Sequence, residues 1–180
     1  MSESKTPLRL AGVVRESIVD GPGIRMTVFV QGCPHHCKGC HNQHTWDFEG
    51  GYQSSVERVL EEAAKDPLLK GVTLSGGEPF CQAEALTVLA KRAHEMGLNV
   101  FCYSGFTFEK LMADFDTHPE YKSLLEQCDW LVDGPFIEEE MSLMLHFRGS
   151  RNQRILDVPR SLKEGKAVLS EYNGPRVSAK

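Results

Sequence analysis

Three cysteines separated by three and then two residues, Cys33, Cys37 and Cys40, constrain this chain more than any other feature. Cysteines four and three positions apart could share one face of a helix, but the intervening sequence opposes a helix. Pro34 lacks a backbone N–H, and glycines at positions 32 and 39 supply flexible backbone. We therefore expect a loop whose main-chain N–H groups can approach a bound anionic group closely.

Three thiolates in one loop indicate a metal centre with one coordination position left open. Iron–sulfur clusters that carry electrons are usually held by four cysteines, whereas a three-cysteine cubane leaves one iron free to bind a substrate or cofactor. Four histidines share the stretch, and we expect them to be solvated: His35, His36, His41 and His44. A structural zinc site of the Cys3His type stays open as an alternative, as do unliganded or disulfide-linked cysteines.

The length of 180 residues suits a single domain, residues 1–180, with flexible ends expected at 1–6 and 173–180. The formal net charge of −5 disfavours a general nucleic-acid or anionic-membrane surface. No apolar run has membrane-spanning length, and the first seven residues lack the apolar core of a signal peptide. We therefore expect a cytoplasmic protein without direct nucleic-acid or membrane partners.

The remaining cysteines, Cys81, Cys102 and Cys128, are isolated in the sequence, which fits a reducing compartment rather than a disulfide framework. At least two of them are expected to be small buried hydrophobic residues.

Hydrophobic patterning predicts strands alternating with helices. Ser54 to Glu57 has the form of a capping box at the start of a helix with Val56, Val59, Leu60 and Ala63 on one face. Further helices are expected at about 83–96, 109–114 and 121–127. Strands are expected at 8–14, 24–30, 71–74, 98–103 and 129–132, with weaker signals at 153–158 and 166–169. Strands separated by helical stretches imply βαβ units, so we expect an α/β fold with an open parallel sheet that curls as a partial barrel.

Four of these strands end in polar, glycine-bearing tips. The tips are Gln31-Gly32-Cys33, Ser75-Gly76-Gly77-Glu78, Ser104-Gly105 and Asp133-Gly134. Carboxyl ends of parallel strands lie on one rim, where active sites of α/β folds assemble. The cysteine loop and the glycine motif are therefore expected to share a mouth. Taken alone, Gly76-Gly77 could equally be a plain turn between a strand and a helix.

These motifs resemble those of the radical S-adenosylmethionine enzymes, through Cys33-x3-Cys37-x2-Cys40 and Gly76-Gly77-Glu78-Pro79. The segments Asp20-Gly21-Pro22-Gly23-Ile24-Arg25 and Cys40-His41-Asn42 are similar to those of the glycyl-radical activating enzymes. The short length and the late segment 147–155 resemble the subgroup that acts on anaerobic ribonucleoside-triphosphate reductase. The likeness spans roughly residues 8 to 158.

The resemblance implies an oxidoreductase with a partial parallel β/α barrel and one 4Fe-4S cluster on Cys33, Cys37 and Cys40. S-adenosylmethionine would chelate the fourth iron. Reductive cleavage of this cofactor would give a 5′-deoxyadenosyl radical, which takes hydrogen from a glycine of the large catalytic subunit of the reductase. A flavodoxin-type or similar donor would supply the electron, and a homodimer is possible. No catalytic residues are implied beyond the cluster and the cofactor.

The resemblance also implies cofactor-binding residues, namely Gly39, Cys40, His41, Gly76, Gly77, Glu78, Pro79, Ser104 and Asp133. Many members carry an aromatic residue before the third cysteine, where this chain has Gly39, so backbone contact must replace ring contact there. The segment Cys102-Tyr103-Ser104-Gly105 lacks an acidic residue that helps to bind a cation in the pyruvate formate-lyase activase.

Two further interpretations concern charged residues. Asp20 could hold the glycine loop of a partner, or serve only as a turn residue. Arg148, Arg151 and Arg154 could meet an acidic partner surface or the carboxylate of the cofactor, or form a solvated loop.

Three other functions stay open. The target could be another glycyl-radical enzyme such as pyruvate formate-lyase, or a small molecule. A zinc-stabilised binding module without catalysis is the alternative from a different class.

Overall fold

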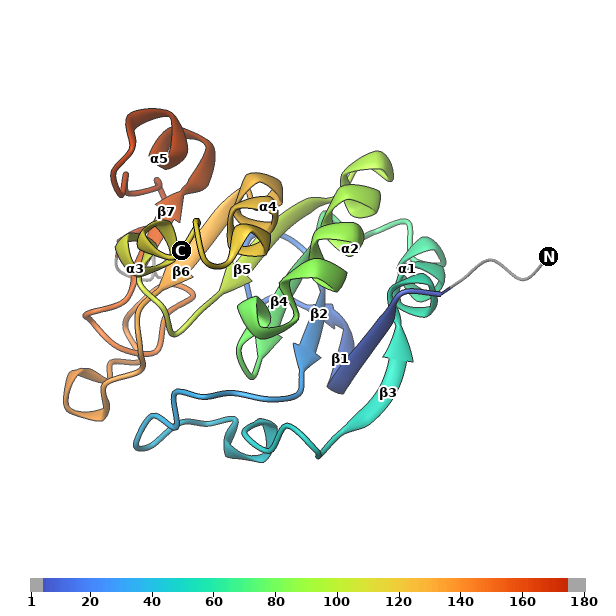
Figure 1. Ribbon diagram of the computed structural model, residues 1–180, viewed down its shortest axis with the longest axis horizontal. Coiled ribbons are helices and arrows are strands. Elements are labelled where there is room, and N and C mark those ends of the chain that lie inside the picture. Colours follow the sequence, from blue (N-terminus) through green and yellow to red (C-terminus); the bar gives the residue numbers. More distant parts are fainter. Residues whose placement is uncertain (1–4, 175–180) are drawn as a thin grey trace.

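The computed structural model describes residues 5–174 and contains a seven-stranded sheet of order β3-β1-β2-β4-β5-β6-β7 (Figure 1). The strands are β1 (Pro7–Ser17), β2 (Arg25–Val30), β3 (Tyr52–Ser55), β4 (Gly71–Gly76), β5 (Asn99–Tyr103), β6 (Trp130–Asp133) and β7 (Arg154–Asp157). Strands β2, β4, β5 and β6 run parallel, whereas β1, β3 and β7 pair antiparallel at the two ends. The expected α/β fold with an open sheet and a parallel centre is therefore confirmed.

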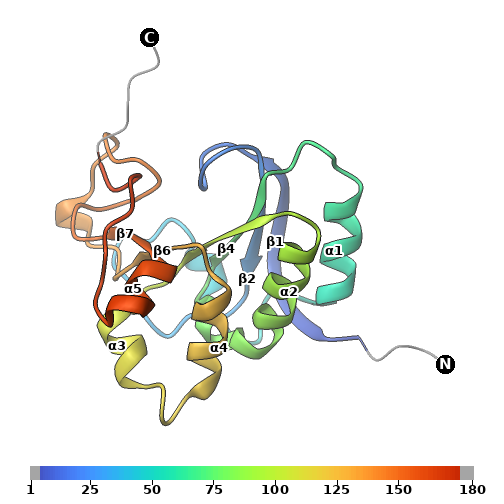
Figure 2. The same cartoon turned by 90° about the horizontal axis from the view of Figure 1, so that it is seen from above.

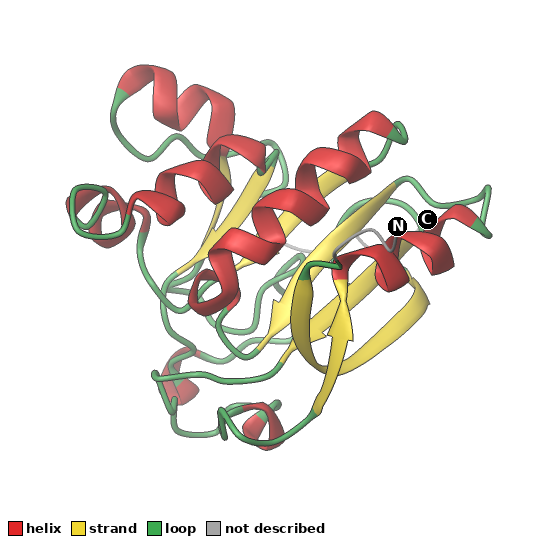
Figure 3. Cartoon of the chain, turned by 45° about the vertical axis from the view of Figure 1, so that its right-hand side comes forward, coloured by secondary structure: helices red, strands yellow, loops and turns green. Residues whose placement is uncertain are grey.

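The helices gather on one face of this sheet (Figures 2 and 3). They are α1 (Val56–Ala64), α2 (Ala83–Glu95), α3 (Phe108–Ala113), α4 (Pro119–Gln127) and α5 (Val158–Glu164). Three short 3-10 helices are η1 (Gln43–Thr45), η2 (Pro79–Gln82) and η3 (Glu138–Glu140). Within residues 5–174, no helix combines the length and the apolar character needed to cross a membrane.

The core lies between the helices and the sheet. In β2 the side chains of Met26, Val28 and Val30 face it, since successive strand residues point to opposite faces. Leu86 and Leu89 of α2 meet them from the helical layer, both fully buried. Burial of each such side chain contributes about 1.5–3 kcal/mol. This layer fixes the strand ends that carry the polar tips.

Helix α1 buries the four apolar residues that the sequence predicted. The capping box, however, is wrong. Ser55 rather than Ser54 caps the helix, accepting a hydrogen bond from the Arg58 N–H at 3.2 Å. Glu57 accepts the Thr6 N–H instead, because β3 brings the first residues of β1 beside α1.

Arg25 lies on the face of the sheet opposite the helices and is fully buried. Its guanidinium donates to Thr73 Oγ1 at 2.8 Å, the Pro22 carbonyl at 2.9 Å and the Val72 carbonyl at 2.9 Å. Burial lowers the pKa of Arg25 to about 10, and the cation is held by these acceptors and by the Phe101 ring. The side chain thus fastens the turn at 20–23 onto the sheet.

Several sequence predictions need correction. No strand forms at 166–169, where only Leu169 makes a single bridge to Leu156. Strand β3 and helix α5 were not predicted. Residues 1–4 and 175–180 of the expected flexible ends lie outside the described residues. Asn173, the first residue of the flexible end expected at 173–180, accepts hydrogen bonds from the Ile155 N–H at 2.8 Å and from Arg148 at 3.1 Å.

Candidate functional site

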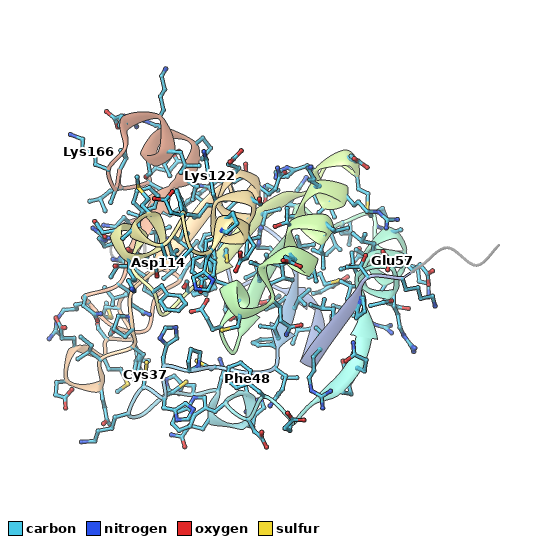
Figure 4. The ribbon with its side chains drawn as sticks, viewed as in Figure 1. Cys37, Phe48, Glu57, Asp114, Lys122 and Lys166 are labelled. Carbon is cyan, nitrogen blue, oxygen red and sulfur yellow. The ribbon has the colours of Figure 1, made fainter. Side chains whose placement is uncertain are left out.

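A cavity of about 140 Å³ opens at the carboxyl ends of the parallel strands. It is lined from all four polar tips, by Cys33, by Ser75, Gly76 and Gly77, by Ser104 and Gly105, and by Gly134. The sequence predicted that these tips share one rim, and the cavity confirms it. The loop that follows β2 runs past these strand ends, and Figure 4 marks Cys37 and Phe48 along it.

All three cysteines of the loop line this cavity. Their thiols are free, and Cys33 is buried while Cys37 and Cys40 are partly exposed. Free thiols were also found at the three isolated cysteines, of which Cys102 and Cys128 are buried, as expected of small apolar residues.

Backbone N–H groups favour the thiolate form at two of the three sulfur atoms and donate a hydrogen bond to the third. Burial raises the pKa of Cys33, and the N–H groups of His35 and His36 oppose that rise. Burial likewise raises the pKa of Cys37, with the Phe136 N–H opposing it. Cys40 Sγ accepts the Asn42 N–H at 3.4 Å. Donors of this kind stabilise sulfur that carries negative charge, as cluster-bound thiolates do.

The donor set fits an iron–sulfur cluster. Three free thiols line one cavity. A cubane distributes its cysteine ligands over different irons, and three thiols with amide donors around a common space can serve that purpose.

Glu78 of the glycine motif is fully buried and does not line the cavity. Its carboxylate contacts His35 Nε2 at 2.6 Å and accepts the Gly105 N–H at 2.8 Å and the Ser104 hydroxyl at 2.9 Å. The second oxygen accepts the Phe80 N–H at 3.0 Å. Both oxygens are thus bound to protein groups, so Glu78 joins the cysteine loop to the ends of β4 and β5.

Gly76 and Gly77 do line the cavity, and neither position has room for a side chain. A Cβ on Gly77 would come within 2.2 Å of the Gly32 carbonyl oxygen. Gly76 has φ +96, and its Cβ would meet the Val30 backbone nitrogen at 2.5 Å. The two backbones touch here, because the Glu78 N–H donates to the Gly32 carbonyl at 2.8 Å. Glycine is required for the cysteine loop and the β4 turn to meet.

Four other residues expected at the cofactor do not line the cavity: Gly39, His41, Pro79 and Asp133. Gly39 faces the Glu138 side chain, and the His41 ring packs on Phe136 at 5.6 Å. Pro79 is buried at the start of η2. Asp133 accepts bonds from Arg154 and from the Phe108 N–H, so its carboxylate is engaged inside the fold. Of the two residues proposed at the ends of β5 and β6, Ser104 lines the cavity and Asp133 does not.

Sequence reasoning missed other residues that line the cavity, including Asn42, Trp46, Tyr103, Phe136 and Gln153. Of these, Asn42 stands in the motif Cys40-His41-Asn42, whereas the others have no motif that links them to the cysteines. Tyr103 is the last residue of β5, and its place next to the predicted site residue Ser104 could have indicated that it also lines the cavity. Its hydroxyl donates to the Phe147 carbonyl at 2.7 Å, and burial raises its pKa, so it stays a neutral donor.

Asp20, Arg148 and Arg154 hold the fold through hydrogen bonds and ion pairs. Asp20 Oδ2 accepts the Ser17 hydroxyl at 2.6 Å and the Thr27 hydroxyl at 3.1 Å, as a turn residue does. Arg148 donates to the Gly174 carbonyl at 2.6 Å. Arg154 bridges Asp133 and Glu109. Of the three late arginines, the structure leaves Arg151 exposed.

Comparison with known proteins gives a consistent result. Residues 19–156 match the family model described as a 4Fe-4S single cluster domain. A crystal structure of QueE from Escherichia coli overlaps with a TM-score of 0.45 and 18% identity, covering 56% of this chain and 53% of that one, which is too distant to support an argument.

Three curated relatives carry the same name, anaerobic ribonucleoside-triphosphate reductase-activating protein. The relative from Vibrio cholerae is 38% identical over 146 residues, which cover 77% of this chain and 90% of that protein. The relative from Escherichia coli strain K12 is 32% identical, with 76% and 90% covered. The relative from Enterobacteria phage T4 is 30% identical, with 76% and 86% covered. The chain therefore belongs to the family of anaerobic ribonucleoside-triphosphate reductase-activating proteins, with a 4Fe-4S single cluster domain.

Proposed function

We propose that this chain is a radical S-adenosylmethionine enzyme that activates anaerobic ribonucleoside-triphosphate reductase. The observation that carries the proposal is the single cavity in which three free thiols meet the glycine turn of β4. The names of the relatives indicate the target. When bound, a 4Fe-4S cluster supplies one electron to the sulfonium, and the 5′-deoxyadenosyl group released with methionine takes a hydrogen atom from a glycine of the reductase.

Cys33, Cys37 and Cys40 are proposed to hold three of the four irons as thiolates. The amide donors at each sulfur favour the thiolate form, which offsets the cost of burying charge. Donors near the sulfur atoms favour the more negative, reduced cluster, so they also help to set its reduction potential. In a one-electron couple, each ~59 mV changes the equilibrium constant tenfold.

The open side of the cavity is proposed to bind the methionine end of S-adenosylmethionine. Gly76, Gly77 and Ser104 lie there, and backbone carbonyls at the glycines can accept bonds from its ammonium group. Glu78 is proposed to act behind them, holding the turn and the cysteine loop in register through its buried bonds. Asp133 is proposed to act structurally too, by binding Arg154 and the Phe108 N–H.

The adenine side and the protein partners are proposed from the family. Gly39 and His41, which flank Cys40, are proposed to line the adenine side, and Pro79 is proposed to act with the glycine motif at the amino group of the cofactor. A flavodoxin-type donor would deliver the electron. The partner glycine must enter the cavity mouth, because a primary radical released elsewhere would attack the first C–H bond it met. Homodimer formation is the remaining proposal.

Activation of the partner tests this function directly. The anaerobically reconstituted chain is incubated with the large reductase subunit, S-adenosylmethionine and a reductant, and the mixture is examined by electron paramagnetic resonance. We expect a glycyl radical on the reductase and an equal amount of 5′-deoxyadenosine. Pyruvate formate-lyase serves as the competing target. A radical on pyruvate formate-lyase alone would assign the chain to that other glycyl-radical enzyme.

A further inference from the structure

The indole nitrogen of Trp46 is a buried donor that lacks an acceptor. Among the described residues, its Nε1 atom is shielded from solvent and has no hydrogen-bond partner. Trp46 also lines the cavity with the three cysteines. A buried N–H without an acceptor costs free energy, and such groups are rare unless a bound group satisfies them.

The position of this indole ring is fixed by the cysteine loop itself. The ring stacks on His36, with centroids 4.5 Å apart and planes 7° from parallel. The Trp46 carbonyl accepts the Cys33 N–H at 3.1 Å, and the neighbouring Thr45 carbonyl accepts the Gly32 N–H at 2.6 Å. Since all three contacts are with residues 32–36, which lie at the start of the cysteine loop, the indole is held against the cysteine side of the cavity.

The glycine side of the cavity is served by other groups. Ser104 and Gly105 lie there with Gly76 and Gly77, and Glu78 ties them together from behind. We therefore expect the acceptor of the Trp46 N–H to belong to the group that the cysteines hold, and not to a molecule bound at the glycine turn.

We propose that the Trp46 N–H donates a hydrogen bond to a sulfur atom of the bound iron–sulfur cluster. The proposal rests on the function proposed above. Sulfur gains negative charge when the cluster is reduced, so this bond is stronger in the reduced form and raises the reduction potential. Trp46 is thus a positioning and tuning residue for electron transfer.

The test replaces one atom of the side chain. Trp130 is the only other tryptophan, and it does not line the cavity. In the Trp130→Phe variant, Trp46 is uniformly replaced by the benzothienyl analogue, which has sulfur in place of the N–H and the same shape. The same variant with ordinary tryptophan is the matched control. Redox titration followed by electron paramagnetic resonance then measures the midpoint potential without S-adenosylmethionine.

We expect the analogue to bind the same amount of cluster and to lower its reduction equilibrium constant about three- to tenfold, a shift of ~30–59 mV to more negative potential. An unchanged potential overturns the inference. If the analogue also binds S-adenosylmethionine more weakly while the potential stays unchanged, the acceptor of the Trp46 N–H lies on the cosubstrate instead of the cluster. Failure of the control protein to bind any cluster would instead overturn the proposed function.

A second measurement needs no change at position 46. Ultraviolet resonance Raman of the Trp130→Phe protein follows the indole band that reports N–H hydrogen bonding, before and after cluster reconstitution. We expect the band to move to the hydrogen-bonded frequency when the cluster binds. A band that stays at the frequency of the free N–H contradicts the proposal, even if the analogue protein fails to fold.

Discussion

His35 Nε2 lies 2.6 Å from Glu78 Oε1, joining the middle of the cysteine loop to the turn that follows β4. The Glu78 side chain is fully buried, and that of His35 is 16% exposed. Gly105 lets the imidazole come close, since a Cβ there would lie 2.4 Å from the ring. The contact therefore holds the cysteines at a fixed distance from the strand ends.

Replacing Glu78 by Gln should destabilise the protein and loosen the loop. The amide presents a donor to groups that also donate, such as the Phe80 N–H, so a buried bond is lost. We expect a loss of about 1–3 kcal/mol in the free energy of unfolding by urea. Hydrogen exchange of 33–41 in the metal-free protein should also become faster. The exposed Glu61→Gln variant is the control, and equal stability of the two variants would refute the structural role of Glu78.

Gly77→Ala should damage the site, whereas Gly12→Ala should not. A Cβ at position 77 meets backbone atoms of Gly32, which cannot rotate away, while a Cβ at position 12 meets nothing within 4 Å. Overpacking of this kind costs about 1–3 kcal/mol. Urea unfolding and the binding of S-adenosylmethionine to the reconstituted protein should both reveal the difference. If Gly77→Ala binds the cosubstrate as the Gly12→Ala control does, close approach of the two loops is not needed.

Each loop cysteine should be necessary for the cluster, and Cys81 should not. Cys33→Ala, Cys37→Ala and Cys40→Ala are expected to lose most bound iron and sulfide after anaerobic reconstitution. Cys81 does not line the cavity that the three loop thiols share, so it is not placed to bind the cluster. Cys81→Ala is therefore the matched control. Loss of the cluster in Cys81→Ala, or its retention in a loop variant, would show that the ligands are assigned wrongly.

The ion pair between Glu109 and Arg154 should stabilise the fold only above acidic pH. The hydrogen bond that Arg154 donates to Glu109 lowers the pKa of this carboxyl from the ordinary value of 4.5. A carboxyl with a lowered folded pKa contributes stability fully above its unfolded value and loses it as the pH falls through the folded value. The stability difference between the parent and Glu109→Gln should thus be constant near pH 7, begin to shrink as the pH falls to the ordinary value of 4.5, and disappear once the pH is below the lowered pKa of Glu109. A difference that persists at low pH, measured by urea unfolding, would contradict this assignment.

Much of the fold could be predicted because local signals agreed with the tertiary structure. Val56, Val59, Leu60 and Ala63 recur at helical spacing, and all four are buried in α1. Strand β3 gave no such signal. Of its four residues, Tyr52 and Gln53 are exposed, and the segment forms a strand only because β1 offers an edge for pairing. Helix α5 starts at Val158 with Asp157 as its cap and a proline in its first turn, whereas the hydrophobic pattern predicts a strand over 153–158.

The site was predictable where it depends on strand ends and not where it depends on side-chain partners. Parallel strands place their carboxyl ends on one rim, so Cys33, Gly76 and Ser104 meet as expected. The motif predicts that Glu78 binds the cofactor, because nothing in the sequence indicates that the distant residues His35 and Gly105 occupy its oxygen. Trp46 was missed for the corresponding reason, since its place beside Cys33 arises from backbone contacts made by the loop.

The central claim is that three cysteines hold a 4Fe-4S cluster with one iron open to S-adenosylmethionine. The most direct measurement is electron paramagnetic resonance of the anaerobically reconstituted and reduced protein, recorded before and after addition of S-adenosylmethionine. The claim predicts a cubane signal that changes on addition, with cleavage to 5′-deoxyadenosine and methionine. A signal that does not respond to the cosubstrate, or colourless protein containing stoichiometric zinc, would contradict it.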